Sequence, residues 1–212
     1  MRGILINNSV HTGRDFNMIM TAKDIPFPAP QTLTVEIPGR DGLLDLSESL
    51  TGEISYKNRP LKFCFVGDGS RETVLSLIDR MSEYHGQYIT VTTDDYPGWY
   101  YTGRANLTYS DKGFLVEFTL AIDAQPFRFA IIPKTYTVEA PDDQTVKVYN
   151  EGRAVVPIII TTDETTVKKG DKTTKLSAGT YEAEGFILSP GYNDFTFTSD
   201  GTVTITYTER AI

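Results

Sequence analysis

The stretch Pro38-Gly39-Arg40-Asp41-Gly42-Leu43-Leu44-Asp45-Leu46-Ser47 decides how the first half of this chain is interpreted. It follows an alternating segment at residues 32–37 and precedes a second polar turn at residues 51–52. Pro38 has no backbone donor, and Gly39 and Gly42 permit positive φ angles, so we expect a strand to end here in a tight loop. Arg40 and Asp41 then lie at the tip of that loop. A charged tip fits a ligand site, a subunit contact or a solvated corner, and the residues alone leave all three open.

The composition favours a folded, β-rich protein. The chain has 212 residues, of which 40% are hydrophobic and 11% aromatic, and this is enough to bury a sizeable core. Phe, Tyr, Thr and Val are plentiful, apolar runs are short and turn residues recur at short intervals, which favours strands. We therefore expect a mainly β protein with one α-helix.

The charge argues against one class of function. A net charge of −8 does not suit a sequence-independent nucleic-acid binder, which needs clustered Lys and Arg. Acidity is compatible with a conduit through which DNA slides. The single cysteine, Cys64, excludes an internal disulfide. The apolar run at residues 4–6 is too short for a signal peptide, and no segment approaches the roughly 18 apolar residues of a membrane span, so we expect folding in the cytoplasm.

One helix is predicted, over residues 70–85. Ser70 is a candidate N-cap and Gly86 a candidate C′ residue. Apolar residues recur at spacings of three and four and form one stripe, which we expect to pack on a sheet face: Val74, Leu77, Ile78, Met81 and Tyr84.

Strands are predicted on both sides of this helix, including a hairpin-like pair at residues 53–56 and 61–66. In the second member Leu61, Phe63 and Phe65 share one face, and Cys64 on the other face is expected to be half-buried. Further strands are predicted at residues 4–7, 16–21, 88–93, 99–109 and 114–122.

Asp94 and Asp95 are adjacent carboxylates that invite a catalytic interpretation. Neighbouring side chains in a strand point to opposite faces, so these two do not flank one scissile bond from a strand, and we interpret them as Asx-turn caps. The aromatic residues beside them, Tyr96, Trp99, Tyr100 and Tyr101, offer a sugar platform. A carbohydrate-binding module is therefore the alternative function, although the Tyr-Tyr pair sends one ring to each face.

No catalytic constellation is found. The two histidines, His11 and His85, stand far apart in the sequence, and none of the common nucleophile, phosphate-loop or metal-ligand spacings occurs. We expect no enzymatic activity, no cofactor and no bound metal.

The remainder of the chain predicts a separate β domain. Residues 131–134 make a plausible boundary, which gives domains at residues 1–133 and 134–212. The second domain alternates Thr, Val, Ile and Tyr between frequent turns, and this predicts a small sandwich of seven or eight short strands. Residues 156–160 form its continuous apolar core strand, and Pro157 places that end at an edge.

The ordered motifs of the first domain resemble one known family. The run PGRDGLLDLSESLTGEISYKNRPLKF (residues 38–63), a helix ending at His85-Gly86, and DDYPGWYYTGR (residues 94–104) are similar to the distal tail protein family of long-tailed bacteriophages. The likeness covers residues 1–130. The second domain resembles, in outline only, the galectin-like β-sandwich of that family.

The resemblance implies a structural hub. The first domains would form a hexameric ring with an open centre for DNA, and the sandwiches would lie at its periphery. The ring would join the tail tube to the tail tip or baseplate in a virion assembled in the host cytoplasm, without specific nucleic-acid or membrane binding. A closed ring uses two different complementary surfaces, for which we expect these residues: Pro38, Gly39, Arg40, Asp41, Gly42, Asp94, Asp95, Trp99 and Arg104.

Overall fold

The computed structural model describes residues 3–49, 52, 54–140 and 142–212. Contacts divide the chain into two compact units, Met1–Arg128 with Ile212, and Phe129–Ala211. Each unit is described by itself below.

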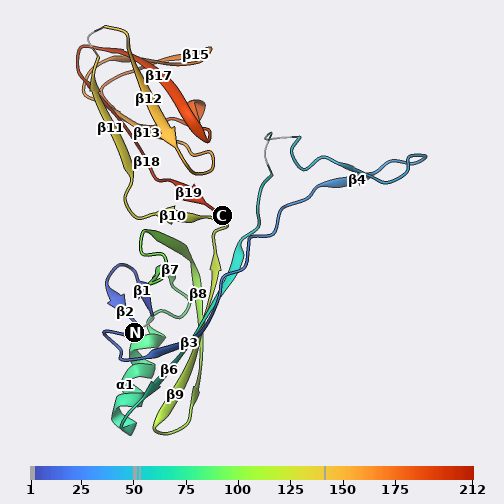
Figure 1. The fold of residues 1–212 in the computed structure, drawn as a ribbon, viewed down its shortest axis with the longest axis vertical. Coiled ribbons are helices and arrows are strands. Elements are labelled where there is room, and N and C mark those ends of the chain that lie inside the picture. The colour runs from blue at the N-terminus through green and yellow to red at the C-terminus, as the bar shows by residue number, and fades with distance from the viewer. Residues whose placement is uncertain (1–2, 50–51, 53, 141) are drawn as a thin grey trace. The chain divides into compact units, whose positions relative to one another are not determined.

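The first unit is built on a sheet whose strand order is β2-β1-β7-β8-β9-β6-β3 (Figure 1). Its strands are β1 (Ile4–Ile6), β2 (Val10–His11), β3 (Ile19–Asp24), β6 (Arg59–Asp68), β7 (Tyr88–Thr93), β8 (Trp99–Asp111) and β9 (Leu115–Ala124). Every pairing along this path is antiparallel. The short strands β10 (Arg128–Ala130) and β19 (Arg210–Ala211) pair with each other. The mainly β prediction is confirmed.

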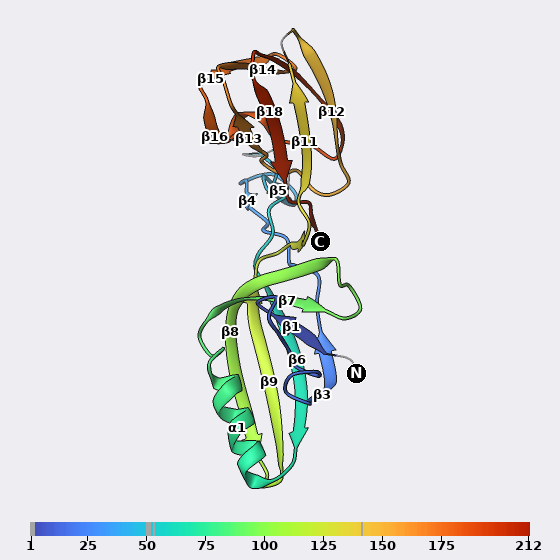
Figure 2. The ribbon, with the colours of Figure 1, turned by 90° about the vertical axis from the view of Figure 1, so that its left-hand side faces the viewer.

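Helix α1 (Arg71–Ser82) packs on this sheet through its apolar stripe (Figure 2). Val74, Leu77 and Met81 are buried, and Ser70 caps the helix by accepting the Thr73 N–H at 3.2 Å. The helix ends three residues earlier than predicted, because the Tyr84 and His85 N–H groups bond to carbonyls three residues back and tighten the last turn. Gly86, at φ 75°, belongs to the turn that follows and is not the C′ residue.

The central strand β6 follows the predicted alternation. Leu61, Phe63 and Phe65 are buried and Cys64 is half-buried. The predicted pairing of residues 61–66 with 53–56 is wrong, because β3 and β9 take the two edges of β6. Residues 54 and 55 belong to no strand, and residue 53 lies outside the described residues.

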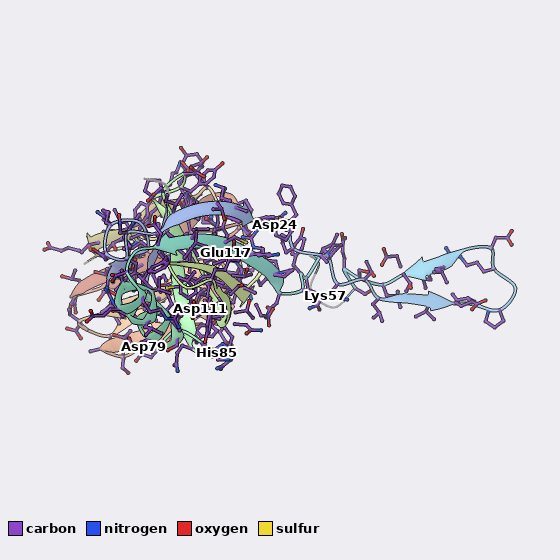
Figure 3. All side chains as sticks on the ribbon, turned by 90° about the horizontal axis from the view of Figure 1, so that it is seen from below. Asp24, Lys57, Asp79, His85, Asp111 and Glu117 are labelled. Carbon is purple, nitrogen blue, oxygen red and sulfur yellow. The ribbon has the colours of Figure 1, made fainter. Side chains whose placement is uncertain are left out.

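The chain leaves the sheet between β3 and β6 as an extension that we call the arm, which comprises the described residues 26–49, 52 and 54–58. Figure 3 shows it beyond Asp24 and Lys57 as a thin ribbon with side chains on both faces. Strands β4 (Thr34–Glu36) and β5 (Leu43–Asp45) pair antiparallel there, with Val35 opposite Leu44. The connecting loop has Gly39 at φ 83° and Gly42 at φ 79°, which confirms the predicted tight loop.

The second unit is a β-sandwich of two four-stranded sheets. One has the order β11 (Lys134–Glu139), β18 (Thr202–Tyr207), β13 (Ile158–Thr161), β16 (Gly179–Glu182); the other has β12 (Gln144–Asn150), β17 (Gly191–Ser199), β14 (Thr165–Lys169), β15 (Lys172–Leu176). A short 3-10 helix, η1 (Glu184–Phe186), precedes β17. Val148, Ile159, Phe195, Phe197 and Ile205 belong to one buried cluster. The described strands agree with the predicted small sandwich.

The apolar segment at residues 156–160 differs from its prediction. Strand β13 pairs with both β18 and β16, so it is an interior strand and not an edge. Pro157 precedes its first residue, where the missing N–H disrupts no ladder, and the Pro157 carbonyl accepts the Ala183 N–H at 3.0 Å. Only Ile159 is fully buried, since Val156 and Ile160 are each 39% exposed.

Candidate subunit interface

The arm exposes apolar side chains along both of its strands. Leu33 is 52% exposed, Val35 41%, Ile37 37% and Leu43 62%. Backbone bonds hold the ribbon together, such as Leu46 N–H to the Leu33 carbonyl at 2.8 Å, and the Ser47 hydroxyl accepts the Leu33 N–H at 2.8 Å. A two-stranded ribbon of this kind has little stability alone in water, so these apolar groups are suited to being covered by another surface.

The tip of the arm carries two charges without an internal partner. Arg40 and Asp41 are exposed, and their side chains form no hydrogen bond or ion pair with any described residue. Asp45 is different, because hydrogen bonds from the Ser47 hydroxyl and N–H lower the pKa of its carboxyl group. The predicted loop residues are thus together at one exposed tip.

Asp94 joins distant parts of the first unit. Its Oδ2 accepts the Gly3 N–H at 2.8 Å, and its Oδ1 lies 3.0 Å from His11 Nε2. The Asx-turn interpretation of Asp94 is wrong, because the carboxylate bonds to groups more than 80 residues away instead of its own turn. Partial burial raises the pKa of Asp94, but the hydrogen bonds from His11 and Gly3 outweigh it and lower the pKa overall.

The His11–Asp94 pair has no free base nitrogen. His11 is 4% exposed, and its Nδ1 accepts the N–H groups of Gly13 and Arg14, each at 3.1 Å. Nδ1 therefore carries no proton and Nε2 donates to Asp94. Because both ring nitrogens are used inside the fold, this pair acts as a structural latch.

The other predicted charged residues bond to separate parts of the unit. Lys23 forms an ion pair with Asp95, which ties the edge strand β3 to the loop after β7. Arg104 donates from Nη1 to the Gly86 carbonyl at 2.7 Å. No hydrogen bond or ion pair of the described residues joins these groups to the tip of the arm.

Trp99 lies in a cluster that the sequence reasoning did not identify. The guanidinium of Arg128 lies over the rings of Tyr96 and Trp99, at 5.2 and 5.1 Å from their centres. Arg59, which is 2% exposed, lies 4.6 Å above the Tyr101 ring. We call these five residues the arginine–aromatic cluster. The one sequence signal that could have drawn attention to Arg128 is its place between two aromatic residues, Phe127 and Phe129.

The cluster does not support the alternative sugar platform. Tyr101 is 4% exposed, so its ring is not available for stacking. Arg128 already lies over two of the three remaining candidate rings, Tyr96 and Trp99. To stack there, a pyranose ring would have to displace the Arg128 guanidinium, which itself interacts favourably with both aromatic rings.

Neither a metal centre nor a membrane span emerges from the described residues. They contain no group of three or more His, Cys, Asp or Glu residues arranged to hold a metal ion. Helix α1, with 12 residues, is too short to cross a membrane, and no other helix of the described part is longer.

Comparison with solved structures identifies the class of fold. The SPP1 Dit (gp 19.1) protein, described as a paradigm of the hub adsorption apparatus in Gram-positive infecting phages, matches with a TM-score of 0.71 and 16% identity, over 100% of both chains. The chain therefore has the fold of a phage distal tail protein, which confirms the resemblance seen in the motifs. A designed double-stranded β-helix covers 37% of the chain at a TM-score of 0.25. Neither the models of protein families nor the curated proteins gave a match.

Proposed function

We propose that this protein is a structural subunit of a phage tail, namely the distal tail hub. It forms a ring, hexameric by analogy with the motif family, that connects the tail tube to the tail tip or baseplate and leaves a channel for DNA. Residues 1–133 form the ring, and the sandwich at residues 134–212 lies at its periphery. The protein works in the virion, after assembly in the host cytoplasm, and catalyses no reaction.

The observation that carries this proposal is the uncovered arm. An exposed apolar ribbon on an otherwise well-packed unit fits a protein whose final form is an assembly. A ring needs a heterologous contact, in which one surface of each subunit meets a different surface of the next. The arm supplies one such surface, and the SPP1 Dit protein, whose fold the chain shares, is described as a paradigm of a hub adsorption apparatus.

The acidity of the chain is compatible with the proposed channel. With a net charge of −8, the protein as a whole repels phosphate groups and does not hold them. A conduit for DNA has to let the molecule slide, so weak binding is an advantage there.

The test is the mass in solution over a concentration series, with electron microscopy of the same samples. A species of 6 × 23.6 kDa, about 142 kDa, with sixfold ring images is expected. A monomer at every concentration, with no rings on the grid, would contradict self-assembly. Binding to immobilised glycans by such a monomer would favour the carbohydrate module instead.

A further inference from the structure

Among the described residues, the arginine–aromatic cluster contains two cations and no carboxylate paired with either of them. Arg128 forms no hydrogen bond or ion pair with a described residue, and its Nε is buried without a partner. Arg59 donates a long bond, 3.5 Å, from Nη1 to the Pro26 carbonyl, and its Nε and Nη2 are also buried without partners. Burial lowers the pKa of Arg59, and the charge of Arg128 lowers that pKa further. A carboxylate beside the cluster would offset the repulsion between the two arginines and accept hydrogen bonds from their unpartnered N–H groups.

The geometry of Arg128 suits such a carboxylate. Its guanidinium lies over two aromatic rings, and these contacts favour one orientation of the planar group before any partner arrives. An oriented guanidinium binds a carboxylate through two parallel N–H donors at a smaller entropic cost than a free one. Arg128 is only partly buried, which leaves the cluster open to a partner from outside.

The arm has the complementary charge. Residues 33–49 contain four carboxylates, Glu36, Asp41, Asp45 and Glu48, against one cation, Arg40. Asp45 already accepts hydrogen bonds from Ser47. Asp41 lies at the turn, is exposed and has no partner within the described chain. It is thus the tip carboxylate that is free to bind another surface.

We propose that the arm of one copy docks on the arginine–aromatic cluster of the next copy, with the Asp41 carboxylate bound to the Arg128 guanidinium. This inference rests on the proposed ring and names the two surfaces that close it. Trp99 and Tyr96 support Arg128 at the acceptor surface, and the apolar side chains of the arm pack around the edges of these rings that Arg128 leaves uncovered. The contact is heterologous, as a ring requires, because donor and acceptor are different parts of the chain.

Charge reversal tests the pairing. Arg128→Glu and Asp41→Arg, each alone, place like charges together and should raise the concentration needed for assembly about tenfold or more. The double variant restores an opposite pair and should assemble within about threefold of the wild type. Arg14→Glu makes the same charge change at an exposed residue outside both surfaces and should leave assembly unchanged. Unfolding curves of each variant show whether the fold is retained.

The chain also contains a built-in reporter. Trp99 is its single tryptophan, so tryptophan emission, excited selectively over that of the tyrosines, reports on the acceptor surface. The emission maximum of the wild type should shift to shorter wavelength at the same concentration at which the solution mass rises, because the docked arm removes water from around the Trp99 indole. An emission that stays constant through assembly would overturn the proposed contact.

The remaining outcomes separate this inference from the proposed function. A wild type that forms rings while Arg128→Glu forms them equally well overturns the pairing and leaves the hub intact. Rescue of Arg128→Glu by Glu36→Arg, but not by Asp41→Arg, overturns the assignment of Asp41. A wild type that never assembles overturns the ring and this contact together.

Discussion

His11 Nε2 lies 3.0 Å from Asp94 Oδ1, across 83 residues of sequence. The bond joins β2 to the loop after β7, and the Gly3 N–H adds a second bond to the same carboxylate. A residue that looked like part of a local turn thus fixes the start of the chain to the sheet. Because these hydrogen bonds favour the ionised form of Asp94, its contribution to stability depends on pH.

Replacement of Asp94 by Asn should destabilise the first unit modestly. The amide can still accept the Gly3 N–H but cannot satisfy the His11 donor in the same way. The Asp94 side chain is 39% exposed, so after allowance for solvent screening the loss of unfolding free energy is expected to be about 1 kcal/mol near neutral pH. Urea unfolding of the wild type and the variant measures it.

The same pair gives an acid-side test. Because the pKa of Asp94 is lowered in the folded state, its contribution is present above the ordinary carboxyl pKa, about 3.9, and is lost as the pH falls through the lower folded value. The difference between wild type and Asp94→Asn should therefore shrink below about pH 4. A constant difference from pH 3 to pH 7 would speak against the latch.

Gly103→Ala should prevent the first unit from folding stably. A Cβ at this position would lie 2.2 Å from the Asp123 carbonyl oxygen, on the backbone of the paired strand β9. Backbone cannot move aside as a flexible side chain does, so a loss of about 3 kcal/mol or more is expected. Gly98→Ala is the matched control, since nothing lies within 4 Å of its added Cβ. Thermal melts in which the two variants behave alike would contradict the close approach.

Leu43→Lys should weaken assembly without affecting the fold. Leu43 is 62% exposed on the arm, so the subunit loses little packing, whereas a covered interface would have to bury a charge. The melting temperature of the dilute protein should be unchanged while the mass at high concentration falls. Leu75→Lys, at an exposed position of α1, is the control and should assemble normally. If the two variants assembled equally well, the arm would not be part of the interface.

Lys134→Met should destabilise the sandwich. Lys134 Nζ lies 2.7 Å from Glu209 Oε1, which also accepts the Glu151 N–H, and Glu209 is only 6% exposed. Without the ammonium a carboxylate stays buried beside a neutral side chain, at a cost of about 1–3 kcal/mol. Lys168→Met, at an exposed position of β14, should have little effect on chemical denaturation.

The ion pair also predicts the alkaline behaviour of the sandwich. The hydrogen bond to Glu209 raises the pKa of Lys134 above its ordinary value. The contribution is therefore complete below the unfolded lysine pKa, about 10.4, and is lost as the pH rises through the higher folded value. Wild-type stability should fall over this range more steeply than that of Lys134→Met. If the stability of the wild type and of Lys134→Met fell equally with pH, the contribution of the Lys134–Glu209 ion pair would be contradicted.

Much of the local structure could be predicted from the sequence. The loop at residues 38–42, the apolar stripe of α1 and the alternation of Leu61, Phe63 and Phe65 follow from backbone preferences and side-chain periodicity, which act over a few residues. The same rules placed the end of the helix three residues late, because the tightened last turn depends on hydrogen bonds that periodicity does not reveal. They also paired residues 53–56 with 61–66, since nearness in sequence favours a hairpin.

The candidate interface was predictable in part. The exposed tip with Arg40 and Asp41 was identified by its turn residues. Arg128 was missed, because its position over Tyr96 and Trp99 requires the end of β9 and the start of β8 to lie side by side. Asp94 was found but misinterpreted, since its partners Gly3 and His11 lie on strands whose pairing is not encoded locally.

The sequence by itself determined the β-rich class, the single helix, the tight loop and the motifs that indicate a distal tail fold. These depend on short-range rules: which φ angles a residue permits, and which face a side chain takes. Only the tertiary structure decided that residues 26–58 leave the sheet as an arm, that Asp94 latches His11, and that two arginines share an aromatic cluster without a carboxylate. Those features arise from strand order and register, which bring residues far apart in sequence to within hydrogen-bonding distance.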